Sequence, residues 1–225
     1  MSLVVILCEG EHDAWFFEKI MEKNFSNDQI YTILDNRMDK LQKILGENFS
    51  YIRTKYSLII YGDNGRDPLI EKVLPRVMVD TLGKITVNIY LLLIVDDDGV
   101  GYDKLKISVS DKLSSISRDR SKFNPLPELN QNGERFILRH PRTQGYIEVI
   151  FRNVPGSLEG QIVRKAIEIK YPNEIRTLQK YGPDRTFDHL ASKYYGDNKK
   201  SLIRESVNWL ENEKWIQSIL ELFST

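Results

Sequence analysis

The sequence predicts an α/β fold built on a doubly wound, mainly parallel sheet. Residues 3–8 form a continuous apolar run, which is typical of a strand buried on both faces of a parallel sheet. The residues from 12 to 23 carry apolar side chains at helical spacing. Residues 57–61 and 87–95 repeat the pattern of an apolar strand followed by a turn and a helix. This alternation is the repeating unit of a parallel sheet covered by helices.

The second strong strand and its helix are marked by glycine and proline. Residues 57–61 end in Gly62-Asp63-Asn64-Gly65, which is a strong turn signal. Pro68 suits the first turn of a helix that runs to about Leu82, and Pro75 predicts a kink within it. Before this unit, residues 30–34 are compatible with a short strand and residues 38–45 with a helix.

The most apolar strand, residues 87–95, stops abruptly at Asp96-Asp97-Asp98-Gly99. The rest of the chain is predicted to contain a helix at 102–120, a loop at 123–133, a hairpin of strands at 134–140 and 146–153, and helices from 158 to 223. Breaks in these last helices are expected near Pro172, Gly182-Pro183 and Gly196. We therefore expect an α/β domain at 1–140, with a hairpin strand and helical C-terminal extension at 141–225 packed on the same domain.

Composition excludes several classes of protein. The chain has 225 residues, of which 41% are hydrophobic, so it can bury a core and is not expected to be disordered. Cys8 is the only cysteine, which excludes a disulfide framework and a cysteine-rich zinc site. The apolar run at 3–8 lacks a preceding basic stretch and is no signal peptide. No apolar stretch approaches the ~20 residues that span a bilayer, so we expect a cytoplasmic protein without membrane contact.

The net charge of zero conceals an uneven distribution. Residues 1–100 hold 11 basic and 16 acidic side chains, whereas residues 101–200 hold 19 basic and 12 acidic ones. An acidic part beside a basic part suits a metal-binding carboxylate cluster next to a surface that binds a polyanion. The alternative is random variation over a solvated surface.

Acidic side chains follow two strands that are expected to be neighbours. Glu9 stands at the carboxyl end of the first strand, and Asp96 to Asp98 stand at the end of the strand at 87–95. Adjacent strands lie ~4.8 Å apart, so these carboxylates would meet at one edge of the sheet. Asp96 and Asp98 would point to the same side and Asp97 away from it, as a solvent-facing or additional acidic group. Clustered carboxylates need a cation, and Mg²⁺ or Mn²⁺ prefers such oxygen ligands.

Two motifs carry a family resemblance. The first is Cys8-Glu9-Gly10-Glu11-His12-Asp13, and the second is Asp96-Asp97-Asp98-Gly99-Val100-Gly101. Together, at strand ends and in this order, they resemble the Toprim domain of topoisomerases, bacterial primases, the 5S ribosomal RNA maturase and overcoming-lysogenization-defect nucleases. The resemblance covers roughly residues 1 to 140. It implies a Rossmann-like fold of the Toprim kind.

The resemblance also implies roles for particular residues. Glu9 matches the family's glutamate, a general acid or base and a possible metal ligand. Asp96 and Asp98 match the Mg²⁺-binding aspartates, and Asp13 matches a further acidic position. Gly156-Ser157-Leu158-Glu159 resembles a segment of small stand-alone Toprim-like proteins, which makes Glu159 another candidate acidic group.

Phosphate contacts are expected from glycine-rich turns and from basic side chains. The candidates are Gly10, Gly62, Gly65, Lys104 and Arg142. The alternative for the two basic side chains is a solvated surface. His12 is interpreted as a side chain at the start of a helix, since a lone histidine beside a motif carries little information.

The departures from the family narrow the function. The chain has little room for the separate tyrosine domain of topoisomerases, cannot build the zinc domain of primases, and lacks an ATPase motif. We therefore expect a Mg²⁺-dependent nuclease that acts on RNA or DNA. One alternative is a non-catalytic module that binds nucleic acid or a nucleotide at the same acidic edge, and another is a phosphatase. The oligomeric state stays open, with a homodimer as one possibility.

Overall fold

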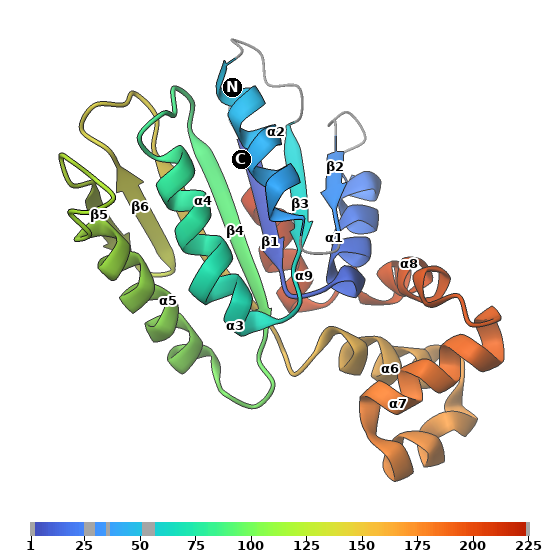
Figure 1. Ribbon diagram of the computed structural model, residues 1–225. Helices are drawn as coiled ribbons and strands as arrows, with labels where there is room; N and C mark the ends of the chain where they lie inside the picture. Colours follow the sequence, from blue (N-terminus) through green and yellow to red (C-terminus); the bar gives the residue numbers. More distant parts are fainter. Residues whose placement is uncertain (1–2, 25–29, 35–36, 51–56, 224–225) are drawn as a thin grey trace.

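The computed structural model describes residues 3–24, 30–34, 37–50 and 57–223, and it contains a seven-stranded sheet with helices on both faces (Figure 1). The strand order is β2-β3-β1-β4-β7-β6-β5. The strands are β1 (Leu3–Cys8), β2 (Ile30–Ile33), β3 (Leu58–Gly62), β4 (Ile89–Asp96), β5 (Glu128–Asn132), β6 (Arg135–Arg139) and β7 (Ile147–Val154).

The sheet is mostly parallel, as predicted. β1 lies between β3 and β4 and is parallel to both, and β2 and β7 extend the parallel part on either side. β6 pairs antiparallel with β7, which confirms the expected hairpin, and β5 pairs antiparallel with β6. The prediction that the first strand and the strand at 87–95 are neighbours is confirmed.

Helices follow the strands and cover both faces. They are α1 (Glu11–Asn24), α2 (Met38–Ser50), α3 (Arg66–Pro68), α4 (Leu74–Thr81), α5 (Tyr102–Ser117), α6 (Leu158–Ile169), α7 (Ile175–Tyr195), α8 (Lys199–Leu210) and α9 (Lys214–Leu220). Short turns of other helix types lie at Leu69–Val73, Pro172–Glu174 and Glu221–Phe223. No helix in the described ranges is long and apolar enough to cross a membrane.

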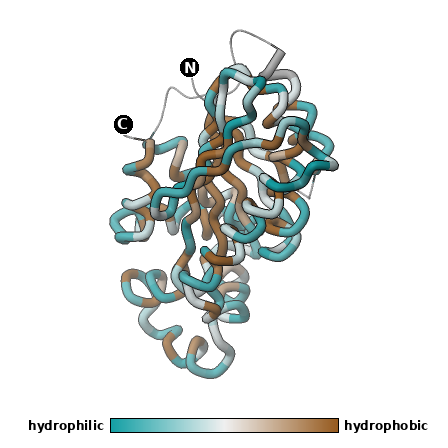
Figure 2. The backbone as a smooth tube through the Cα atoms, turned by 90° about the vertical axis from the view of Figure 1, so that its left-hand side faces the viewer, coloured by the Kyte–Doolittle hydropathy of each residue, from teal (hydrophilic) through white to brown (hydrophobic). Residues whose placement is uncertain are grey.

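Two apolar cores sandwich the sheet. In β1, Leu3, Val5 and Leu7 pack in the core that includes α2, α4 and α5, whereas Ile6 and Cys8 pack in the core that includes α1 and α6 to α9. Successive side chains of a strand point to opposite faces, so a strand buried on both sides must be apolar throughout. Figure 2 shows apolar residues gathered in the central strands and polar ones on the outer helices.

The helical segment after β3 is irregular for a local reason. α3 runs through a π-helical turn at Leu69–Val73 into α4, which begins just before Pro75. Proline has no N–H to donate to the preceding turn, and the turn directly before Pro75 is the one that widens to the π-helical form. The kink predicted at Pro75 therefore takes the form of a wider turn before it.

The expectation of a loop throughout residues 123–133 was wrong. Glu128–Asn132 forms the edge strand β5, although its side chains are mostly exposed and polar. It lacks the apolar alternation that marks a strand, and it forms because β6 offers a free edge two residues away across the tight turn at Gly133. A polar edge strand such as β5 has no hydrophobic pattern by which it could be predicted from the sequence.

Of the C-terminal helices, α6 and α7 lie beyond the carboxyl ends of the strands, whereas α9 lies behind the sheet (Figure 1). Their predicted breaks are confirmed: a turn starts at Pro172, Gly182 interrupts α7 with a φ of 77°, and Gly196 ends α7 in the left-handed conformation. Glu174 fixes the start of α7. It is 3% exposed and accepts hydrogen bonds from Lys193 at 2.7 Å and from Tyr194 and Thr177 at 2.8 Å.

We expect Glu174→Gln to destabilise the helical extension. The Lys193 hydrogen bond, more than any other contact, holds the pKa of Glu174 down at about 2. The ionised Glu174 therefore contributes to the free energy of unfolding. This contribution is complete above the unfolded pKa near 4.5 and is lost as the pH falls toward 2. Urea unfolding should show a loss of about 1–3 kcal/mol at pH 7 and a smaller loss at pH 3.

The matched control for Glu174 is Glu168→Gln. Glu168 is a carboxylate on α6 whose side chain is 65% exposed and lies 3.1 Å from Lys165. An exposed pair of this kind contributes little, so the control should change stability by less than about 0.5 kcal/mol. Equal urea midpoints for both variants at pH 7 would contradict the role of Glu174.

Candidate active site

The parallel pairing of β1 and β4 brings Glu9 and Asp96 together. Leu7 lies opposite Leu93, so the two strands end at the same edge of the sheet. The backbone N–H of Asp96 donates to Oε1 of Glu9 at 2.9 Å. The convergence of these carboxylates, expected from the sequence, is therefore present in the structure.

Burial and mutual repulsion perturb both groups. Burial, followed by the charges of Asp13 and Glu9, raises the pKa of Asp96 to about 9. Burial also raises the pKa of Glu9 to about 7, although the Asp96 N–H and the nearby Arg66 work against it. Oδ1 of Asp96 is buried and accepts no hydrogen bond. Raised carboxyl pKa values of this kind show that burial, with a smaller contribution from neighbouring carboxylates, disfavours the ionised forms in the absence of a cation.

The loop after β4 separates the roles of its aspartates. Asp97 Oδ1 accepts the N–H of Gly101 at 2.6 Å, so this side chain closes the loop on itself. Asp98 adopts a φ of 46°, its backbone N–H donates to the carbonyl of Gly156, and its side chain is 53% exposed. Asp98 lines the acidic pocket and Asp97 does not, as expected, but the cause is the left-handed turn at Asp98 and not the alternation of an extended strand.

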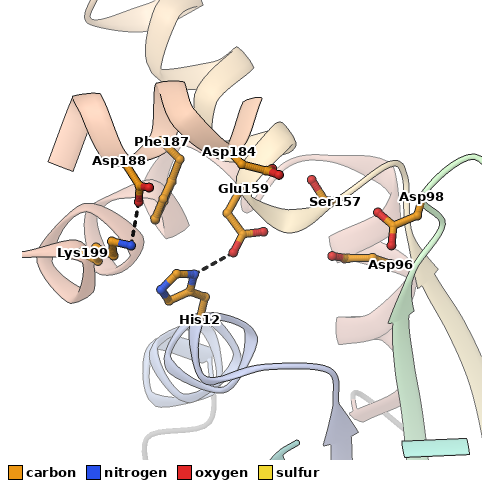
Figure 3. Close-up of a pocket in the computed structure, with 9 residues that line it drawn as sticks. All are labelled: His12, Asp96, Asp98, Ser157, Glu159, Asp184, Phe187, Asp188 and Lys199. Atoms are coloured by element: carbon orange, nitrogen blue, oxygen red, sulfur yellow. Dashed lines mark hydrogen bonds and ion pairs between the residues drawn. The ribbon is translucent and has the colours of Figure 1, made fainter. Parts of the chain in front are cut away.

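A pocket of about 360 Å³ lies where the carboxyl edge of the sheet meets the helical extension (Figure 3). Its two sides come from different parts of the chain, because β4 and α1 supply one and α6 to α8 supply the other. It is lined by His12, Asp96, Asp98, Ser157, Glu159, Asp184, Phe187, Asp188 and Lys199. Glu9 is not among them and adjoins the pocket through its bond to Asp96.

The expectation that His12 is a simple helix-start side chain was wrong. Its Nδ1 lies 2.6 Å from Oε1 of Glu159, at the start of α6 (Figure 3). The ring lies 5.7 Å from that of Trp15 and 5.3 Å from that of Phe187, which fixes its orientation. Burial alone would raise the pKa of Glu159, but the His12 hydrogen bond and its own backbone N–H lower it overall. Glu159 thus joins the acidic pocket, as proposed from its motif.

Asp13 lies behind the pocket on the first turns of α1. It is 8% exposed, and burial together with the charges of Glu159 and Glu9 raises its pKa well above the ordinary value. It lies close enough to Asp96 to raise the pKa of that carboxyl, but it does not line the pocket.

Of the predicted phosphate-binding residues, the glycines have a structural role in the loops, whereas the basic side chains lie away from the acidic pocket. Gly62 is needed for close packing of loops, because a Cβ there would lie 2.6 Å from the carbonyl oxygen of Gly10, and Gly65 has a φ of 102°. Lys104 is exposed on α5 and does not line the acidic pocket.

Arg142 lies at the wrong edge of the sheet for a phosphate contact at this site. It belongs to the turn that precedes β7, and β7 runs 8 residues before it reaches the acidic edge. At about 3.3 Å a residue, that separation is roughly 25 Å. The hairpin connection has to start β7 at the amino edge, so its basic side chains gather there.

The sequence interpretation missed Arg66. Its Nη1 lies 3.9 Å from Oδ2 of Asp98, its charge lowers the pKa of Glu9, and Nη1 is buried without a hydrogen bond. Its position directly after the turn at Gly62 to Gly65 was an available signal. Lys199, Asp184 and Asp188 were also missed, and only the tertiary placement of α7 and α8 reveals them.

The expected Mg²⁺ or Mn²⁺ needs side chains at the acidic pocket that can bind it through oxygen. In the part of the chain that the structure describes, no group of three or more His, Cys, Asp or Glu side chains is arranged to hold an ion. Mg²⁺ commonly uses only one or two protein carboxylates, with water and substrate phosphate completing its shell. Asp96 and Asp98 suit that smaller requirement, since Oδ1 of Asp96 is buried without a partner.

Comparisons with known proteins add little. No protein-family model matches the chain, and no curated protein matches it. A de novo designed protein with a P-loop NTPase fold is 19% identical, with a TM-score of 0.31 over 50% of this chain and 75% of that one. A designed PLOOP2X3 fold protein is 8% identical, with a TM-score of 0.37 over 96% of this chain and 98% of that one. Similarities this low carry no argument about family or function.

The acidic pocket should reduce the stability of the chain when no cation is bound. A carboxyl whose folded pKa is raised destabilises the native state as the pH rises from its unfolded pKa toward the folded one. We therefore expect Asp96→Asn in EDTA to raise the free energy of unfolding by about 1–3 kcal/mol at pH 8, with little change at pH 4. Urea unfolding at the two pH values measures this difference.

Asp111→Asn, an exposed position on α5, is the matched control and should leave stability within about 0.5 kcal/mol of the parent protein at both pH values. A destabilised Asp96→Asn at pH 8 would show instead that the Asp96 charge is well compensated in the folded state.

Proposed function

We propose that the chain is a Toprim-like, Mg²⁺-dependent enzyme that hydrolyses phosphodiester bonds in RNA or DNA. The observation that carries the proposal is the direct link between Glu9 and Asp96 at the ends of neighbouring parallel strands, beside Asp98 in one acidic pocket. The pairing of these strands supports the Toprim resemblance, because that resemblance requires the two motifs to meet.

The residues present fit a divalent ion. Asp96 and Asp98 would hold Mg²⁺ or Mn²⁺, with Glu9 nearby as a further ligand, and Oδ1 of Asp96, which is buried without a partner, is the oxygen best suited to it. When bound, such an ion polarises the phosphate and stabilises the negative charge that develops in the transition state.

The chain's own residues supply the other requirements of hydrolysis. A water oxygen forms a bond to phosphorus while the bond to the leaving sugar oxygen breaks. Glu9 accepts a proton from that water, and the leaving sugar oxygen takes a proton from solvent water. Arg66, whose side chain is 23% exposed and whose Nη1 lies 3.9 Å from Oδ2 of Asp98, holds the phosphate through its guanidinium group.

Glu159 and His12 shape the far side of the pocket. The hydrogen bond between them joins α6 to α1 across the site and fixes the Glu159 carboxylate. The imidazole ring of His12 packs near the rings of Trp15 and Phe187, and these contacts restrict its orientation. Such preorganisation keeps the acidic groups in place as substrate enters.

Asp96→Asn and Asp98→Asn should abolish cleavage while the fold is kept. Each removes a charged oxygen donor, and a loss of at least 10³-fold is the order of magnitude expected for an essential charge-stabilising group. The measurement uses end-labelled single- and double-stranded RNA and DNA with Mg²⁺ or Mn²⁺. Asp111→Asn is the matched control and should cleave at the parent rate.

The proposal fails if the parent protein cuts none of these substrates under either metal. Salt-sensitive binding without cleavage would favour the non-catalytic binding module instead. Release of inorganic phosphate from small phosphate esters alone would favour a phosphatase.

Arg66 provides a second, independent test of the mechanism. We expect Arg66→Ala to lower kcat/KM by about 10- to 100-fold, because it removes a charge-assisted hydrogen bond to the phosphate. Arg66→Lys should restore part of the loss, since it returns the charge without the planar guanidinium. Arg118→Ala, an exposed position after α5, is the control. An unchanged kcat/KM in Arg66→Ala would remove this residue from the mechanism.

A further inference from the structure

A second pocket, separate from the acidic one, lies at the carboxyl end of β3. We call it the β3 pocket; its volume is about 330 Å³. It is bounded by β3, the start of α2 and the helical segment from α3 to α4. Its lining residues are Met38, Tyr61, Asp63, Asn64, Pro68, Lys72, Val73 and Arg76, none of which lines the acidic pocket.

The inner wall of the β3 pocket presents a buried carboxylate. Asp63 is 6% exposed, and its Oδ1 accepts the backbone N–H of Asn64 at 2.7 Å. The other oxygen, Oδ2, lies 3.5 Å from the hydroxyl of the buried Tyr61, which is a long contact for an O–H donor. A buried acceptor with so weak a contact gains from a ligand that donates an N–H or O–H to it.

The rim of the β3 pocket has the opposite charge. Lys72 and Arg76 are exposed and stand about one helical turn apart, so they reach the same side of the segment. Arg76 lies 3.8 Å from Asp80, a loose surface contact that leaves most of its guanidinium donors available. Two neighbouring cations of this kind suit a phosphate group.

Between the carboxylate and the cations, the walls are apolar. Met38, Pro68 and the buried Val73 supply them. A ligand for this pocket therefore needs hydrogen-bond donors at one end, a flat or apolar middle, and an anion at the other end. A volume of about 330 Å³ lies in the range of small-molecule sites.

We propose that the β3 pocket binds a nucleoside monophosphate unit. Its base or sugar donors reach Asp63, its heterocycle lies against Met38 and Val73, and its phosphate lies between Lys72 and Arg76. The unit can be a free nucleotide or one residue of a nucleic-acid strand. Binding does not require cleavage, so this inference stands apart from the proposed function.

The β3 pocket is also coupled to the loop that carries Glu9. The N–H of Asp63 donates to the carbonyl of Cys8 at 3.0 Å, and the N–H of Gly65 donates to that of Glu9 at 2.8 Å. A nucleic-acid strand held in the β3 pocket would therefore be anchored at the end of β3, which is the neighbour of β1 in the sheet, close to the acidic pocket.

Calorimetric titration tests the proposal. The probes are the four nucleoside 5′-monophosphates, the corresponding nucleosides, ribose 5-phosphate and a 5′-phosphorylated hexanucleotide, all in EDTA so that the acidic pocket repels anions. We expect a monophosphate or the hexanucleotide to bind. Asp63→Asn and the double variant Lys72→Gln/Arg76→Gln should each weaken that binding about tenfold or more.

The control is Arg120→Gln/Lys122→Gln, which removes the same charge at exposed positions after α5 and should leave binding within about twofold. The rim variant lies at the surface, so its result holds even if Asp63→Asn proves unstable on heating. Binding of a monophosphate indicates a site for free nucleotide, and binding of the hexanucleotide alone indicates a strand subsite.

Three outcomes would overturn the proposal. One is no binding of any probe. Another is binding of nucleosides as strong as that of monophosphates, which would exclude a phosphate contact. The last is binding that both pocket variants retain.

Discussion

The structure depends on the parallel pairing of β1 with β4, which forces carboxylates from distant parts of the sequence into one partly buried cluster. Because both strands end at the same edge, Glu9 accepts the backbone N–H of Asp96, and neither group can move away without breaking the end of the sheet. Burial then removes the water that would screen their repulsion. Proton uptake by the carboxyls relieves part of the resulting electrostatic cost, as their raised pKa values show, and a bound cation would relieve it further.

The remainder of the fold provides the stability that such a cluster needs. β1, and β4 as far as Val95, consist almost entirely of apolar residues and bury both faces, one against each core. Bulk burial of this kind contributes far more than a few clustered charges remove. The loops at the edge are held locally as well, because Gly62 packs against Gly10 and Asp97 closes the turn after β4. The acidic groups are therefore fixed in position by contacts that do not involve their own charges.

Much of this arrangement could be predicted from the sequence, since buried parallel strands are continuous apolar runs and acidic residues directly after them must lie at one edge. The meeting of Glu9 with Asp96 and the breaks at Pro172 and Gly196 follow from such signals. Other features depend on tertiary placement, which local signals do not contain. β5 is polar and forms only because β6 offers an edge. Arg142 has a suitable charge but lies at the amino edge, and His12 gains its partner only when α6 packs beside α1.

The helical extension is consequently part of the site and not an appendage to it. Glu159 opens α6, Phe187 lies in α7 and Lys199 begins α8, and all three line the same pocket as Asp96. The bond from His12 to Glu159 ties this group to α1, whose position is set in turn by β1. A displacement of the extension would therefore open the pocket and release the Glu159 carboxylate, even with the sheet intact. The acidic edge supplies the charge of the site, and the extension determines its shape and what can enter it.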